Sequence, residues 1–166
     1  MPAMFLRLIC ASAMLSLATP AAARDSLGVF SDWAAFRDPK VPRCYAIAMP
    51  APSRLKRDYE PYASIGTWPK RQIRNQFHIR LSRRIMADRP ITLSIGRQSF
   101  ELAGGGGDAW AQDKRMDAAI VAAMRSAERM TVRARDDRGN SFTDSYALAG
   151  AETAMDAATL GCARLR

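Results

Sequence analysis

Strict alternation of apolar and polar residues marks the clearest predicted strand, residues 76–82. Phe77, Ile79 and Leu81 are apolar and the residues between them are polar, so one set faces a core and the other set faces away from it. Residues 91–102 repeat the pattern on both sides of a turn-like Gly-Arg-Gln. The chain therefore predicts an antiparallel hairpin soon after its clearest strand.

Shorter apolar stretches predict further strands around this hairpin. Residues 27–36 form an early strand or a packed entry segment, and residues 44–48 form a short buried strand after a loop at 37–42 that two prolines define. Several prolines between residues 49 and 69 predict a long connection, ordered or partly mobile. Late strands are expected at 131–135 and, after a turn at 137–140, through Phe142, Tyr146 and Leu148.

Helical periodicity occurs twice. Met116, Ile120 and Met124 recur at helical spacing, which predicts an amphipathic helix over 114–130 with Asp113 as its N-cap. A second helix is expected from Glu152 to Ala163. The expected fold class is β-rich α+β: a compact antiparallel sandwich or partial barrel with one central and one C-terminal helix, in a single domain over 24–166.

The amino-terminal segment has the pattern of a secretory signal peptide. Arg7 gives a weakly positive start, and the apolar run 8–18 is too short to span a membrane, which takes about 20 residues. A Thr-Pro break and three alanines follow, ending at Ala23. We expect a signal peptide over 1–23, cleavage after Ala23, and a periplasmic or secreted protein without a transmembrane segment.

The expected export changes which partners the net charge indicates and which state of the cysteines is expected. The full chain of 166 residues has a formal charge of +9, and cleavage removes one positive charge, Arg7. Outside the cytoplasm this charge favours anionic envelope components over nucleic acid as partners. Cleavage also removes Cys10, which leaves Cys44 and Cys162 as an even pair in an oxidising compartment. One disulfide is expected between them, the alternative being two buried free thiols.

Cofactor and metal sites are not expected. The chain contains no Cys-x-x-Cys motif, and only one histidine and two distant cysteines are available as zinc ligands. The four glycines at 104–107 lack the Gly-Lys-Ser/Thr continuation of a phosphate-binding loop, so we interpret them as a flexible hairpin tip or linker.

Residues that could carry catalysis have simpler structural interpretations. His78 and Ser82 share a strand face but lack an identifiable orienting acid and nucleophile elbow, so His78 is interpreted as a surface histidine. The pair Asp136-Asp137 is interpreted as a solvated hairpin tip. Asp108 and Asp113 flank Trp110, an arrangement that fits a packed tryptophan beside a helix cap better than a sugar site.

The strongest functional signal is electrostatic. No acidic residue occurs between Glu60 and Asp88, and aromatic residues, Tyr62 and Trp68, accompany the basic ones. Such a stretch can bind an anionic polymer by charge and stacking, although it can also be a solvated basic face. The anion-binding candidates are Lys70, Arg71, Arg74, Arg80, Arg83, Arg84 and Trp68.

Several short segments resemble the invasion-associated locus B family of exported bacterial proteins. They are 28–33 (GVFSDW), 44–46 (CYA), 142–150 (FTDSYALAG) and 154–158 (AMDAA), followed by Cys162. The resemblance implies a small β-rich envelope protein without established catalytic residues. Two departures are Ala151, where members often carry an aromatic residue, and a single cysteine pair where some members have more.

These observations lead to a functional hypothesis and an alternative. We expect a non-enzymatic periplasmic or secreted protein that binds an anionic envelope component, such as glycan or lipid head groups, or a protein partner. The alternative is a small envelope-acting hydrolase that uses carboxylates such as Asp108 and Asp113. A factor that assists other envelope proteins is not separable from the first hypothesis by sequence.

Overall fold

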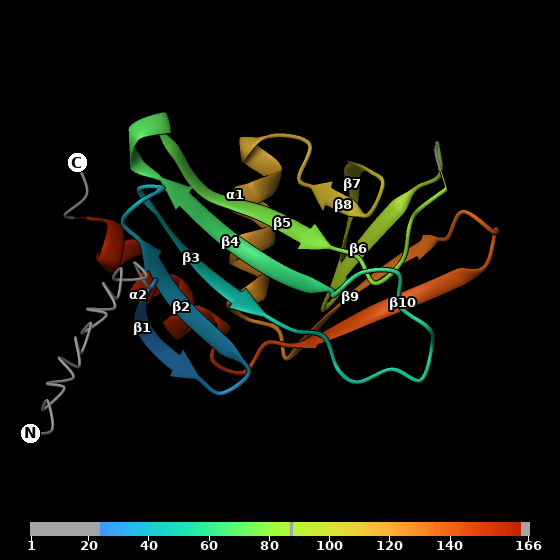
Figure 1. The fold of residues 1–166 in the computed structure, drawn as a ribbon, viewed down its shortest axis with the longest axis horizontal. Coiled ribbons are helices and arrows are strands. Elements are labelled where there is room, and N and C mark those ends of the chain that lie inside the picture. Colours follow the sequence, from blue (N-terminus) through green and yellow to red (C-terminus); the bar gives the residue numbers. More distant parts are fainter. Residues whose placement is uncertain (1–23, 87, 164–166) are drawn as a thin grey trace, which may run out of the picture.

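An antiparallel sheet that curls into half a barrel forms the scaffold (Figure 1). The computed structural model describes residues 24–86 and 88–163, and the predicted signal peptide lies outside them. Within these residues the sheet has ten strands in the order β1-β2-β3-β4-β5-β8-β7-β6-β9-β10. This architecture confirms the β-rich α+β fold in its partial-barrel form.

Most strands that are consecutive in the sequence are also adjacent in the sheet. They are β1 (Asp25–Phe30), β2 (Trp33–Asp38), β3 (Arg43–Ala48), β4 (Tyr62–Trp68), the short 3-10 helix η1 (Pro69–Arg71), β5 (Ile73–Arg80), β6 (Ile91–Ile95), β7 (Gln98–Gly105), β8 (Asp108–Trp110), α1 (Lys114–Met124), β9 (Arg129–Arg135), β10 (Ser141–Ala147) and α2 (Ala151–Cys162).

One face of the sheet carries the core, and both helices cover it. Ala35, Ala46, Ile65 and Phe77 stand opposite one another across β2 to β5, and all four are buried. Helix α2 packs against β1 to β4, whereas α1 packs against β5, β6 and β7. The alternate residues of these strands, among them His78, therefore face the opposite side of the sheet.

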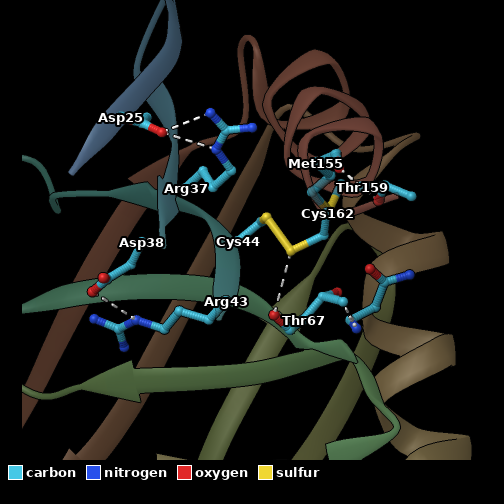
Figure 2. The surroundings of a disulfide bond; sticks show 10 residues. Asp25, Arg37, Asp38, Arg43, Cys44, Thr67, Met155, Thr159 and Cys162 are labelled. Atoms are coloured by element: carbon cyan, nitrogen blue, oxygen red, sulfur yellow. Dashed lines mark hydrogen bonds and ion pairs between the residues drawn. A yellow bond between two sulfur atoms is a disulfide. The ribbon is translucent and has the colours of Figure 1, made fainter. Parts of the chain in front are cut away.

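The disulfide between Cys44 on β3 and Cys162 on α2 confirms the predicted bridge (Figure 2). Its Cα atoms lie 5.7 Å apart, and the two residues are 118 positions apart in sequence. The Cys162 sulfur also lies 3.9 Å from the Thr67 carbonyl oxygen. Because a disulfide sulfur carries no hydrogen, this is a packing contact. The bridge therefore fixes the last helix to the covered face of the sheet.

Two buried aspartates complete the hydrogen bonding of β5. Strand β8 pairs only with residues 78–80, so the earlier part of β5 lacks a ladder partner on that side. There the side chain of Asp117 on α1 accepts a hydrogen bond from the Phe77 amide at 2.8 Å. Just beyond β5, Asp144 on β10 accepts one from the Ser82 amide at 2.8 Å. Both carboxylates are thus structural acceptors for backbone groups that lack another partner.

Helix α1 begins as predicted but ends earlier. The Asp113 carboxylate accepts a hydrogen bond from the Met116 amide, which confirms the N-cap. The expected extension to residue 130 is wrong, because the helix ends at Met124 and β9 begins at Arg129. Met130 fits a helical repeat with Met124, but it also begins the period-2 pattern that pairs with β6 and enters the core.

The long connection expected between residues 49 and 69 is also wrong in its second half. Residues 62–68 form β4, a central strand paired on both sides. Its buried positions include Ala63, which has only a methyl side chain, and Gly66, which has none, so both give little hydrophobic signal. Gly66 leaves space for the Trp68 ring, since a Cβ placed there would lie 2.6 Å from it. The small residues thus serve close packing within the strand.

Two further segments differ from expectation as well. The early segment 27–36 contains parts of two strands, β1 and β2, with Ser31 in a left-handed conformation at their turn. The glycines 104–107 do lie at a hairpin, although Gly104 and Gly105 belong to β7 itself. Gly107 is buried against the Tyr59 ring, which leaves no room for a Cβ at this position. This end of the turn is therefore packed.

Candidate functional site

The basic candidates separate into two groups in space. Arg80 pairs with Asp108 on β8, and its guanidinium lies 3.9 Å from the centroid of the Tyr59 ring. The Arg83 guanidinium donates a hydrogen bond to the Asp136 carboxylate at 2.7 Å, and the Arg84 Nε lies 3.9 Å from a carboxylate oxygen of Asp137. Acidic residues distant in sequence therefore pair with all three arginines of this first group, closely with Arg80 and Arg83 and loosely with the exposed Arg84.

Asp136 is a buried acceptor, which corrects the interpretation of Asp136-Asp137 as a solvated tip. Asp136 is only 2% exposed, whereas the side chain of Asp137 is 45% exposed. Burial by itself raises the pKa of Asp136, but hydrogen bonds from Asn140, Arg83 and Arg138 outweigh that effect and hold it below the ordinary value. Arg83 consequently has a structural role as the cation that pairs with the buried Asp136.

The second group, Lys70, Arg71 and Arg74, lies at the β4–β5 turn and is named here the hairpin-tip cations. Pro69 begins η1, and Gln72 ends it in a left-handed conformation, with its amide donating to the Pro69 carbonyl. This tight turn brings the three cations close together in sequence, and each is exposed. Within the described residues none of them has a carboxylate oxygen within 4.0 Å.

A groove of about 290 Å³ extends the hairpin-tip cations toward α1. Arg74 and Lys114 line it together with Arg125. Arg125 is engaged by Glu152 and Asp156 of α2, whose hydrogen bonds raise its pKa further. Lys114 is exposed and, in the described part of the chain, has no ion pair. Asp117 also lines the groove, with one carboxylate oxygen held by the Phe77 amide. The groove thus has two cations without ion pairs in the described residues, Arg74 and Lys114, beside one acid.

The aromatic candidates occupy different ends of β4. Trp68 lies beside the hairpin-tip cations and is half-buried over Gly66. Tyr62 lies at the other end of the strand, opposite Arg80. The single basic and aromatic stretch of the sequence therefore becomes two separate surfaces, one around the hairpin tip and one around Arg80.

His78 is more than the surface histidine that the sequence suggested. Its Nε2 lies 3.0 Å from the Asp108 carboxylate, and its ring packs between Tyr62 and Trp110 at centroid distances of 5.5 and 5.1 Å. Ser82 is buried, and its amide is bound to Asp144. No hydrogen bond joins Ser82 to His78 among the described residues, so the structure does not assemble a serine–histidine pair.

The two carboxylates of the hydrolase alternative have other partners. Both oxygens of Asp108 are engaged, one by His78 and the other by Arg80. Asp113 caps α1 through the Met116 amide. Trp110 is 38% exposed, which corrects its interpretation as a packed tryptophan. Each carboxylate thus has its own structural partners, and none of these contacts joins Asp108 to Asp113.

Titration of His78 is expected to reflect its burial. Burial lowers its pKa from 6.5 more than the hydrogen bond and charge of Asp108 raise it, and Arg80 lowers it further. The folded state thus disfavours the imidazolium, so this group's contribution to stability is present above pH 6.5 and falls as the pH drops below that value. NMR titration of this single histidine should give a midpoint below 6.5.

The variant Asp108→Asn supplies the matched test of that balance. Removing the carboxylate charge takes away the influence that raises the His78 pKa, so the midpoint should move still lower. The unfolded chain in urea provides the reference, with a midpoint of about 6.5. A folded-state midpoint at or above the unfolded one would contradict this description of the histidine.

Comparisons with known proteins identify a shared fold. No protein-family model matches the chain, and no curated protein matches it. Among solved structures, it is similar to the invasion associated protein B from Bartonella henselae, with a TM-score of 0.59 and 14% sequence identity. The match covers 80% of this chain and 95% of that one. In the described residues, no helix has the length and apolar character needed to cross a membrane.

Proposed function

We propose that this chain is an exported, non-enzymatic envelope protein that binds the phosphate or carboxylate groups of an envelope glycan or lipid through its hairpin-tip cations. The observation that carries the proposal is the separation of the basic residues into two groups. Arg80 and Arg83 are held by aspartates and Arg84 lies near one, whereas Lys70, Arg71 and Arg74 are exposed without such partners in the described chain.

Export is the second component of the proposal. The signal-peptide pattern of residues 1–23 supports it, as does a disulfide, which persists in oxidising compartments. The fold shared with invasion associated protein B supports an envelope role of the kind that the sequence resemblance implies. A part in invasion is not carried over, because fold similarity does not define what a surface binds.

The non-enzymatic component rests on the occupied carboxylates. A hydrolase of the proposed alternative kind needs one acid to donate a proton and another to act as base or nucleophile. Asp108 is held by an imidazole and a guanidinium, and Asp113 holds the start of a helix. Both carboxylates thus have structural partners, which favours the binding function over hydrolysis.

Vesicle binding tests the cation surface. Each basic side chain near an anionic membrane contributes about 1 kcal/mol, so three should contribute roughly a hundredfold in affinity. The variant Lys70→Ser/Arg71→Ser/Arg74→Ser should therefore bind vesicles containing lipopolysaccharide roughly a hundredfold more weakly than the wild type at low salt. Flotation of the purified protein with vesicles at increasing salt measures this difference, since salt screens exposed charges.

A charge-matched variant is the control. Arg97→Ser/Arg129→Ser/Arg133→Ser removes the same charge from exposed residues on the β6–β7 turn and β9. It should retain most of the binding. Equal losses in the two variants would mean that net charge alone governs retention, and no loss in either would exclude the hairpin-tip cations. Arg80 and Arg83 are unsuitable for this test, because their removal leaves Asp108 and Asp136 without their cations.

A further inference from the structure

A second surface lies on the uncovered face of the sheet, across β4, β5 and β8. Tyr62, His78 and Trp110 form a row of three rings with centroid distances of 5.5 and 5.1 Å, named here the aromatic row. The ladder places His78 directly opposite Trp110. Arg74, by contrast, lines the groove beside α1. The aromatic row and that groove therefore lie on opposite faces of the sheet.

The next strand leaves space beside the exposed indole. Ala103 on β7 stands opposite Trp110, and Gly105 stands opposite Asp108. Both residues are exposed, and a Cβ at Gly105 would have no atom within 4 Å. Trp110 thus has the His78 ring on one side and the methyl group of Ala103 on the other. The exposed Trp110 ring therefore lies beside an open patch of surface made by two small residues, Ala103 and Gly105, named here the small-residue floor.

Hydrogen-bonding groups border this floor. Asp108 and Arg80 are paired, and their side chains remain 26% and 28% exposed. The Tyr59 ring beneath the Arg80 guanidinium fixes its position. A carboxylate accepts from two hydroxyl groups and a guanidinium donates through several N–H bonds, so the pair offers both functions side by side. Its two charges offset each other.

We propose that the aromatic row and the Asp108–Arg80 pair bind the pyranose ring of a neutral glycan. The C–H face of a pyranose ring is apolar and packs on an indole, while its hydroxyl groups both donate and accept hydrogen bonds. Aromatic surface with a few fixed polar groups is the usual composition of such small-ligand sites. Because the charges of Asp108 and Arg80 offset each other, this site lacks the free cations that favour a phosphate-bearing ligand, which distinguishes it from the hairpin-tip cations.

Binding of neutral trisaccharides to the purified protein tests the site. The probes are the trisaccharides of glucose, mannose and N-acetylglucosamine, followed by saturation-transfer NMR. At least one should bind the wild type at millimolar concentration, and Trp110→Ala should weaken that binding by about tenfold. Ala103→Arg should block it without removing any buried group, because Ala103 is exposed. Leu160→Ala, at a residue that is 72% exposed on α2, should leave it unchanged.

The outcomes separate this site from the proposed anion surface. Trp110→Ala should still bind vesicles containing lipopolysaccharide, and the hairpin-tip variant should still bind the trisaccharide. The proposal is overturned if none of the three probes binds the wild type, or if neither Trp110→Ala nor Ala103→Arg weakens binding. Tighter binding of a single-stranded oligothymidylate than of any trisaccharide would also overturn it.

Discussion

Replacing both Cys44 and Cys162 with serine is expected to lower the free energy of unfolding by about 3–5 kcal/mol. The bridge joins β3 to the last turn of α2 across 118 positions of sequence. It therefore restricts the unfolded chain over most of its length, and a loop of this size has a theoretical contribution near the upper end of that range. In the folded state, α2 covers β1 to β4, so the bridge holds a large part of the core closed.

Urea unfolding of the double variant and of the wild type with and without reductant measures this effect. The reduced wild type should resemble Cys44→Ser/Cys162→Ser, because both lack the covalent link. The control Val29→Ser, at a residue of β1 that is 73% exposed, should retain nearly the stability of the oxidised wild type. A difference below about 1 kcal/mol would show that the bridge contributes little to the fold.

Trp33→Ala is expected to destabilise the protein by about 3–5 kcal/mol through the cavity it creates. Trp33 is 1% exposed, and its indole nitrogen donates to the Ala147 carbonyl at 2.9 Å. The neighbouring Asp32 amide donates to Ala149 at 3.2 Å. These contacts connect the first hairpin to the end of β10 and the residues that follow it, and β10 lies at the opposite edge of the sheet.

Thermal and urea unfolding of two further variants separate the cavity from the hydrogen bond. Trp33→Phe retains a buried ring but loses the donor, so its cost should be well below that of Trp33→Ala. Val29→Ala, at a residue that is 73% exposed in the same hairpin, should change stability by no more than about 0.5 kcal/mol. Similar losses in Trp33→Ala and Val29→Ala would contradict the role assigned to Trp33.

Local periodicity predicted the elements that have strong side-chain patterns. Phe77 and Ile79 identified β5 because they alternate with polar residues, and the capping aspartate identified the start of α1. Strand β4 was missed because Ala63 and Gly66 signal close packing only when the neighbouring strands are known. The end of α1 was misplaced because Met130 satisfies both a helical and a strand repeat.

In the candidate site, the ion pairs of the basic residues could not be predicted from the local sequence. The sequence between Glu60 and Asp88 contains no acidic residue, yet Asp108, Asp136 and Asp137 lie against its arginines in the fold. Only tertiary structure distinguishes these paired arginines from the hairpin-tip cations. The aromatic row was equally hidden, because β5 and β8 bring His78 and Trp110 together across 32 positions of sequence. Its one local signal was Trp110 between Asp108 and Asp113, which the sequence alone did not show to be exposed.

The mass of the native protein tests the central claim of export most directly. Purification from the extracytoplasmic fraction of the source cells, followed by intact-mass and amino-terminal analysis without reduction, gives the processing site and the cysteine state together. The predicted result is a chain that begins at Arg24 and contains oxidised Cys44 and Cys162. A cytoplasmic chain that retains Met1 and has free thiols would contradict export, and with it the proposed envelope partner.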